Sequence, residues 1–349
     1  MPGGKMVQHS NRKQLDCSGK VLPRMQDVEA NILKVVKGQD EHVRTIVTAV
    51  YRSILLNIKS NVLVMGGSGT GKTEILKQLA HNLNKVYVIE DANEFVQEGF
   101  QGKYVSEIAR DLFYEANYNI KEAEQGMVII DEIDKKAARP TNERDVSGLG
   151  VLNSLLKVIE GKKIKFNVGN EIIVRSKEIS TDNLIIFFAG AFSEMKEIKK
   201  LKHGTSIAGF AQSEGKVDSI TETKQIKQDL VDYGFPEEFV GRIDTIVQLN
   251  ELSEEVLIEI LKNSQNSVFR KYQKQLKEYG IQLKFCKKLF VDIARKAKNA
   301  KTGARELANI VNYMFEKILH DVFCAEKGTY SKCILKKGIE SDNTRYILK

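Results

Sequence analysis

The sequence predicts an α/β fold: a parallel five-stranded sheet between helices, followed by a small, mostly helical domain. Two observations predict the sheet. Five short apolar runs alternate with segments of helical periodicity, which is typical of parallel strands joined by helices. A glycine-rich segment between the first strand and the next helix has the form of a phosphate-binding loop. The five predicted strands are residues 62–65, 86–89, 127–130, 184–188 and 245–249.

The segments before and between these strands complete a large domain, which we place at residues 25–249. Residues 1–24 are polar and lack periodicity, so we expect a flexible N-terminal arm. In residues 25–58, the apolar residues recur mainly at helical spacing, which predicts helices there. Apolar residues recurring on one helical face predict further helices over 75–83 and 104–113.

The character of the chain changes after the fifth strand, and we place a small domain at residues 250–349. Ser253 is expected to begin a helix there, because its side chain can accept a hydrogen bond from the first backbone N–H groups. Glu254 and Glu255 follow in the first turn, where the helix dipole favours negative charge. A short strand at residues 281–283 and two more helical segments complete the domain.

Composition excludes several classes of protein. The 349 residues are 42% hydrophobic and 29% charged, as in ordinary globular proteins. No apolar run approaches the roughly 18 residues of a membrane helix, and the start lacks the core of a signal peptide, so a cytoplasmic location is expected. The four cysteines form no C-x-x-C pair, which disfavours a zinc ribbon or a disulfide framework. The net charge of +8 is spread over lysines that alternate with glutamates, as on a solvated surface.

Residues 66–73 carry the pattern Gly-x-x-x-x-Gly-Lys-Thr of the P-loop. Glycines allow backbone torsions that turn successive N–H groups toward one anion, and the following helix adds its positive end. Lys72 would contact the β- and γ-phosphates, and Thr73 would ligate Mg²⁺. A chance glycine-rich turn is the alternative, but the flanking strand and helix favour nucleotide binding. The predicted phosphate-binding residues are Gly67, Ser68, Gly69, Thr70, Gly71, Lys72 and Thr73.

Two acidic residues, Asp131 and Glu132, end the third predicted strand. Asp131 would hold the hydration shell of Mg²⁺, and Glu132 would orient and polarise the water that attacks ATP. An acidic loop that merely caps a strand is the simpler interpretation of such a pair. The P-loop on a nearby strand makes the catalytic interpretation the better one.

Two arginines could supply the positive charge that phosphoryl transfer requires at the γ-phosphate. Arg242 lies just before the last strand of the large domain, and Arg305 opens a helix of the small domain. From composition alone, either would more often be a surface residue in a salt bridge. Their settings make both of them candidates for the role.

Several segments of the chain are close to the motifs of one family. They are residues 126–135, 144–148, 155–161, 190–192, 238–242, 249–255 and 294–297. Together they resemble the AAA+ unfoldases, and among these the ATP-binding subunits of Clp proteases, over residues 36–325. A generic P-loop protein would share few of these segments. The resemblance implies that ATP is hydrolysed with Mg²⁺ in a ring of identical subunits, with six expected, which unfolds protein substrates.

The resemblance also implies roles for individual residues. Arg242 aligns with the arginine finger, which acts on ATP in a neighbouring subunit, and Arg305 with the sensor-2 arginine. Phe100, at the centre of Gly-Phe-Gln-Gly (99–102), aligns with the pore-loop aromatic residue that grips an unfolded polypeptide. Arg144 falls in the region of the second pore loop. The segment that packs on adenine corresponds to Val36, Lys37, Gly38 and Gln39.

The chain departs from the family's pattern at several points. The N-terminal zinc domain has no counterpart, so we expect the motor core alone. Gln101 stands in the pore loop where an aliphatic residue is usual. The peptidase-docking tripeptide Ile-Gly-Phe reads Ala-Gly-Phe at 208–210, and residues 162–182 lack the basic Arg-Lys-His loop. Ala189 and Gly190 offer no side chain for a sensor-1 contact, so none is assigned.

These features together predict an ATP-driven ring that unfolds and threads proteins, toward a Clp-type peptidase. Two alternatives stay open. The altered docking tripeptide is compatible with a stand-alone chaperone or remodeller that has no peptidase partner. The net charge of +8 is compatible with a nucleic-acid motor on the same core, but an aromatic pore residue and the lack of a helix-turn-helix segment oppose it. No membrane partner is expected.

Overall fold

The structure is a computed structural model. It describes residues 14–15, 19, 21–97, 99–138, 146–170, 173–195, 219–300, 302–335 and 346–349. Arg144 and the expected docking tripeptide at 208–210 lie outside these residues.

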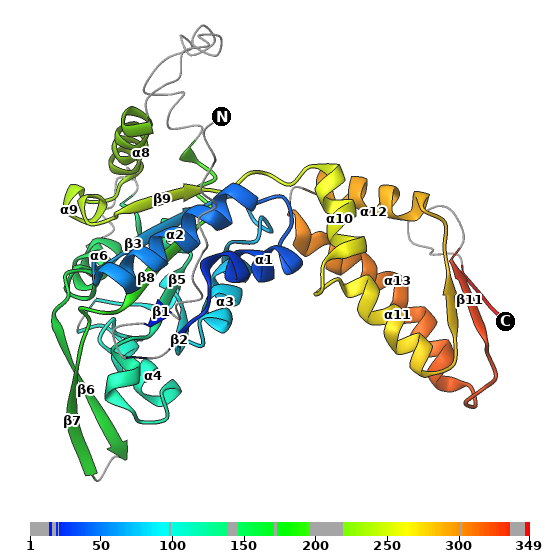
Figure 1. The fold of residues 1–349 in the computed structure, drawn as a ribbon, viewed down its shortest axis with the longest axis horizontal. Helices are drawn as coiled ribbons and strands as arrows, with labels where there is room; N and C mark the ends of the chain where they lie inside the picture. Colours follow the sequence, from blue (N-terminus) through cyan, green and yellow to red (C-terminus); the bar gives the residue numbers. More distant parts are fainter. Residues whose placement is uncertain are drawn as a thin grey trace, which may run out of the picture.

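A parallel five-stranded sheet forms the centre of the larger part of the molecule (Figure 1). Its strands are β3 (Asn61–Met65), β4 (Tyr87–Asp91), β5 (Met127–Asp131), β8 (Ile185–Gly190) and β9 (Thr245–Gln248). They lie in the order β4-β5-β8-β3-β9, and every neighbouring pair is parallel. All five predicted strands are confirmed. Because the strands are parallel, the segments that follow β3, β5 and β8 meet at one edge of the sheet.

Helices cover both faces of this sheet. The helices of the larger part are α1 (Met25–Val35), α2 (Asp40–Leu56), α3 (Lys72–Asn82), α4 (Glu107–Glu115), α5 (Ile120–Ala123), α6 (Val146–Ile159), α8 (Ser219–Tyr233) and α9 (Glu237–Gly241), with short 3₁₀ turns η1 (Ala92–Glu94) and η2 (Ile133–Lys136). Val62 and Val64 of β3 pack in one core with α1, α2 and α3, whereas Leu63 and Met65 pack in another with α4, α6 and α9. Burial on both faces explains why these strands are continuous apolar runs.

The C-terminal part has a core of its own and lies beside the sheet (Figure 1). Its elements are α10 (Glu254–Asn263), α11 (Val268–Glu278), β10 (Gln282–Lys284), α12 (Lys288–Asn299), α13 (Ala304–Cys324), β11 (Lys332–Leu335) and β12 (Tyr346–Leu348). Ser253 caps α10 as expected, since its hydroxyl accepts a hydrogen bond from the Val256 N–H at 3.3 Å. The predicted strand at 281–283 is β10, which pairs with β11 in a three-stranded sheet.

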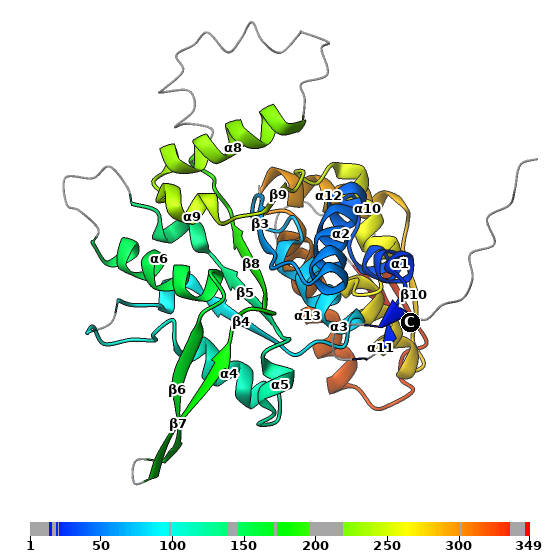
Figure 2. The same cartoon turned by 60° about the vertical axis from the view of Figure 1, so that its left-hand side comes forward.

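Some elements were not predicted. β6 (Lys163–Asn170) and β7 (Ile173–Ser180) form an antiparallel hairpin that projects from the large part (Figure 2). Within the expected N-terminal arm, β1 (Gln14–Leu15) pairs with β2 (Val21–Leu22). Among the described residues, none of the helices combines the length and the apolar character needed to cross a membrane.

Candidate active site

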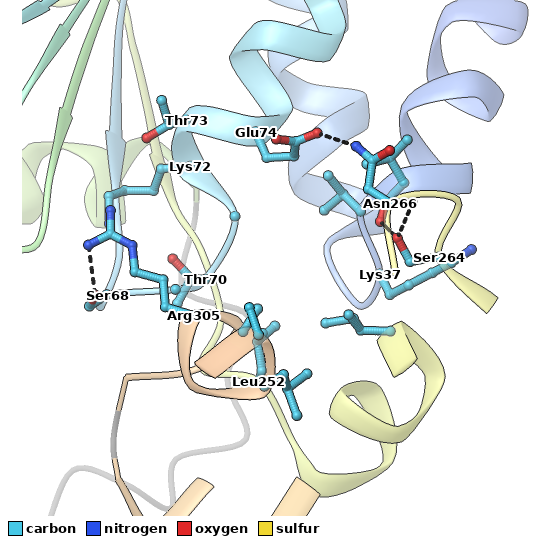
Figure 3. Close-up of a pocket in the computed structure, with 18 of the residues that line it drawn as sticks. Lys37, Ser68, Thr70, Lys72, Thr73, Glu74, Leu252, Ser264, Asn266 and Arg305 are labelled. Carbon is cyan, nitrogen blue, oxygen red and sulfur yellow. Dashed lines mark hydrogen bonds between the residues drawn. The ribbon is translucent and has the colours of Figure 1, made fainter. Parts of the chain in front are cut away.

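A cavity of about 580 Å³ lies between the P-loop and the C-terminal part (Figure 3). The large part contributes the segment before α2, the P-loop with the start of α3, and the segments after β5 and β8. The C-terminal part contributes α10, the start of α11 and the first turn of α13. The lining includes Val36, Lys37, Ser68, Gly69, Thr70, Gly71, Lys72, Thr73, Asp131, Glu132 and Arg305. Most of the residues predicted for nucleotide binding therefore meet in one place.

The glycines of the P-loop are required by the fold around them. Gly69 and Gly71 have φ values of 71° and 102°, in the left-handed region. A Cβ added at Gly69 would lie only 2.1 Å from the carbonyl oxygen of Thr302. The Gly69 carbonyl also accepts a hydrogen bond from the Ala304 N–H at 3.1 Å. The P-loop is thus in backbone contact with the C-terminal part, at a position where only glycine fits.

Lys72, the first residue of α3, lies at the end of the cavity formed by the P-loop. Its Nζ donates hydrogen bonds to the carbonyl oxygens of Gly66 at 2.6 Å and Gly67 at 3.0 Å. Burial lowers the pKa of Lys72, and the carboxylates of Asp131 and Asp134 oppose this shift. A phosphate placed here would offer this ammonium a charged partner and meet the N-terminus of α3.

Thr73 and Asp131 come from different elements but meet directly. The Thr73 hydroxyl donates to Oδ2 of Asp131 at 2.7 Å. A hydroxyl and a carboxylate held together beside a phosphate site are the oxygen ligands that Mg²⁺ prefers. The donor set therefore fits Mg²⁺.

Glu132 follows Asp131 in a left-handed backbone conformation, with φ of 57°. Its N–H donates to Oδ1 of Asp131 at 2.9 Å, and its carboxylate accepts a hydrogen bond from Nδ2 of Asn93 at 2.6 Å. Asn93 was not predicted from the sequence. It follows β4, the neighbour of β5, so its position at the carboxyl edge of the sheet was the available signal.

The four residues expected to pack on adenine are not equivalent in the structure. Val36 and Lys37 line the cavity, whereas Gly38 and Gln39 are not among the described residues that do so. Gln39 is instead buried behind the P-loop, only 1% exposed. Its amide donates to the carbonyl of Asn250 at 2.8 Å, and its oxygen accepts from the Asn250 N–H at 3.2 Å. Its amide also lies 3.4 Å from the carbonyl oxygen of Thr70 in the P-loop.

The two predicted arginines lie in different places. Arg305, at the start of α13, lines the cavity and approaches the Ser68 hydroxyl at 3.5 Å (Figure 3). Arg242 is not among the described residues that line the cavity; its side chain is 55% exposed and lies 3.0 Å from Glu160. The chain thus brings one arginine to its own nucleotide site and presents the other to solvent.

Phe100 also faces solvent, with 60% of its surface exposed. It lies in the loop after β4 and η1, and the Tyr104 hydroxyl donates to its carbonyl at 2.8 Å. A large exposed aromatic side chain on an anchored loop can contact a partner molecule.

Further contacts between the two parts lie along the cavity. Nδ2 of Asn266 donates to Oε1 of Glu74 at 3.0 Å, and the Ser264 hydroxyl donates to the Val35 carbonyl at 2.7 Å (Figure 3). Because both parts form the cavity wall, a ligand bound there would contact both.

This fold and this arrangement of a P-loop with an acidic pair define an ATPase of the AAA+ class. Residues 57–246 match the model of the AAA domain (Cdc48 subfamily), and residues 252–332 match that of the C-terminal, D2-small domain of ClpB protein. The chain belongs to the ClpX family, and as a member it is an ATP-dependent unfoldase of the Clp type.

Curated relatives show this membership. The ClpX of Treponema denticola, an ATP-dependent Clp protease ATP-binding subunit, is 33% identical over 97% of this chain and 86% of its own length. The ClpX of Bacteroides thetaiotaomicron is 31% identical over 93% of this chain and 84% of its own. A ClpX 2 of Wolinella succinogenes is 30% identical over 92% of this chain and 83% of its own. The resemblance stated from the sequence is confirmed.

Proposed function

We propose that this chain assembles into a ring of identical subunits, six by the family resemblance, and hydrolyses ATP with Mg²⁺ at the seams between subunits to pull protein substrates through a central pore. The observation that carries this proposal is the contrast between the two arginines. The nucleotide cavity contains Arg305, while Arg242 lies outside it and is exposed. A second subunit would supply Arg242 to the neighbouring site.

Within one site, the residues have distinct tasks. The P-loop N–H groups and Lys72 would hold the phosphates, Thr73 would ligate Mg²⁺ while Asp131 holds its hydration shell, and Glu132 would orient and polarise the attacking water. Mg²⁺, when bound, would neutralise charge on the phosphate oxygens. Asn93 would hold the Glu132 carboxylate in one orientation, since it is 2.6 Å away. Val36 and Lys37 form the wall on which the base would pack.

A subunit-mixing experiment tests the shared active site. Arg242→Ala should slow hydrolysis on the order of 10³-fold or more, as for other arginine fingers, and Glu132→Gln should abolish it while ATP still binds. In mixed rings, some seams combine an intact Glu132 from one subunit with an intact Arg242 from the other. Phosphate release should therefore recover on mixing. If each variant stays inactive in mixtures whose rings have exchanged subunits, Arg242 does not act on a neighbour's ATP.

Phe100 is proposed to grip the substrate in the pore. Its exposed ring offers a large apolar contact without sequence preference, which suits substrates of varied composition. Phe100→Ala should abolish unfolding of a tagged fluorescent protein in a preparation that still hydrolyses ATP. Full unfolding activity in this variant would exclude the assigned role.

A peptidase is the partner we propose for the ring, since the relatives carry the name of an ATP-binding subunit of the Clp protease. A cytoplasmic location is part of the same proposal. Adding a Clp-type peptidase to the chain and a tagged substrate should yield peptide products that depend on ATP. Unfolding without such products would favour the stand-alone remodeller.

A further inference from the structure

Three charged side chains meet at the base of the loop that carries Phe100. Nζ of Lys103 lies 2.5 Å from Oε2 of Glu90 in β4 and 2.7 Å from Oδ2 of Asp111 in α4. Glu90 is almost fully buried, with 5% of its side chain exposed, and Lys103 and Asp111 are about one-quarter exposed at 23% and 25%. β4 and α4 pack side by side at the edge of the sheet (Figure 2). Lys103 thus joins the loop to two rigid elements.

The backbone closes the loop at the same point. The N–H of Val96 donates to the Lys103 carbonyl at 2.9 Å, and the N–H of Lys103 donates to the Glu94 carbonyl at 3.3 Å. A Cβ added at Gly102 would lie 2.7 Å from the Val96 side chain. The two ends of the loop are therefore held together, and Lys103 is the residue at which backbone and side-chain contacts coincide.

The charges of this cluster depend on one another. Burial raises the pKa of Glu90, and the ammonium of Lys103 opposes that rise. Burial alone would lower the pKa of Lys103, but the hydrogen bonds to Asp111 and Glu90 and the negative charges of these two residues together outweigh burial and raise that pKa. Without Lys103, a buried carboxylate would lose its cation and face a second carboxylate. Local rearrangement would then move the base of the loop.

We propose that Lys103 is a positioning residue for protein unfolding: by joining the loop to β4 and α4, it holds Phe100 in a fixed direction so that movement of the ATPase core is transmitted to the substrate. This inference rests on the proposed function of Phe100. It concerns how force reaches the loop rather than how ATP is hydrolysed, because Lys103 is not among the described residues that line the nucleotide cavity.

The test compares ATP consumption with substrate unfolding in the full chain. Lys103→Met should keep ring assembly and basal ATP hydrolysis but raise the ATP consumed per unfolded molecule by about tenfold, within the range of coupling between contacting residues. Lys103→Arg keeps the charge and should restore most of the coupling. Lys121→Met, an exposed lysine of α5, is the matched control and should behave as the unmodified chain.

Combination with Phe100→Leu, which keeps part of the apolar contact and therefore measurable unfolding, separates this inference from the proposed function. If Lys103 acts through Phe100, adding Lys103→Met to Phe100→Leu should reduce unfolding by a smaller factor than it does in the chain that keeps Phe100. An additive loss in the double variant, or unchanged ATP consumption per unfolded molecule in Lys103→Met, would overturn the inference while the role of Phe100 stands. Should Phe100→Ala itself unfold substrate normally, the proposed function of the loop fails first.

Discussion

Gln39 offers a sharp test of how the P-loop is tied to the C-terminal part of the molecule. Its side-chain amide makes two hydrogen bonds to the main chain of Asn250, at 2.8 and 3.2 Å, where the sheet part ends. The same amide lies 3.4 Å from the Thr70 carbonyl. We predict that Gln39→Leu destabilises the fold and weakens ATP binding, although the residue is absent from the cavity lining.

The magnitude follows from these contacts. Each hydrogen bond of this kind contributes about 0.5–1.5 kcal/mol net, and an unpaired buried group costs more. Asn250 is exposed, so water can replace part of what its main chain loses. The expected loss is about 1–3 kcal/mol of unfolding free energy, which corresponds to roughly 2–12 °C in melting temperature for a domain of this size. The Kd for ATP should rise about fivefold or more if the contact couples the P-loop to the domain boundary.

Thermal melting and titration with a non-hydrolysable ATP analogue measure both effects. Gln39→Glu has nearly the same volume but cannot donate to the Asn250 carbonyl, so it should shift both quantities in the same direction as Gln39→Leu. Gln275→Leu, an exposed glutamine of α11, serves as the control. Melting temperatures and affinities indistinguishable from those of the unmodified chain in both Gln39 variants would refute the reasoning.

Two further predictions concern single charges. Arg305→Ala should weaken ATP binding by about tenfold, the value of a charge-assisted contact that is partly exposed. Arg295→Ala, which changes an exposed arginine of α12, is the control and should bind ATP normally in the same titration. Equal ATP affinities of the two variants would show that Arg305 does not contact the nucleotide. Lys59 is held against the Thr181 carbonyl, and burial lowers its pKa to about 8, opposed by Asp182 and Asp244. Between pH 8 and the ordinary value of 10.5, the unfolded chain therefore binds a proton that the folded chain does not, so folding stability gains with rising pH. The melting temperature of the unmodified chain minus that of Lys59→Met should therefore increase from pH 7 to pH 10. A difference that stays constant over this range would contradict the lowered pKa of Lys59.

The sheet and the phosphate site could be predicted because their signals are local. β3 buries Val62 and Val64 on one face and Leu63 and Met65 on the other, so the strand is an unbroken apolar run. The P-loop is likewise a contiguous pattern whose glycines satisfy local torsions. Thr73 and Asp131 could be paired in advance, because parallel strands end at the same edge of a sheet.

Some contacts between residues far apart in the sequence could not be predicted. Gln39 bonds to a residue 211 positions away, and no pattern around Gln39 indicates that contact. The hairpin β6–β7 did leave a signal, since the buried residues Ile164 and Phe166 alternate along β6 with the exposed residues Lys163 and Lys165. That alternation belongs to a strand with one solvated face, and its interleaved lysines make it less conspicuous than the unbroken apolar runs of the buried strands.

The position of the cavity between the two parts explains why ATP binding and the arrangement of the domains must be linked. Gly69 and Lys72 form one wall, and Arg305 forms another from the start of α13. A nucleotide that contacts both walls binds more tightly to the arrangement in which the two walls are close than to one in which they are apart. Binding therefore shifts the equilibrium toward the close arrangement, by the difference in binding free energy between the two. By the same linkage, a change that separates the walls must weaken nucleotide binding. The hydrogen bond from the Ala304 N–H to the Gly69 carbonyl, at 3.1 Å, is one of the contacts between the two parts that such a separation would break. Under the proposed function, ATP binding would therefore move one part against the other, and the loop that carries Phe100 would move with β4 and α4, to which Lys103 joins it.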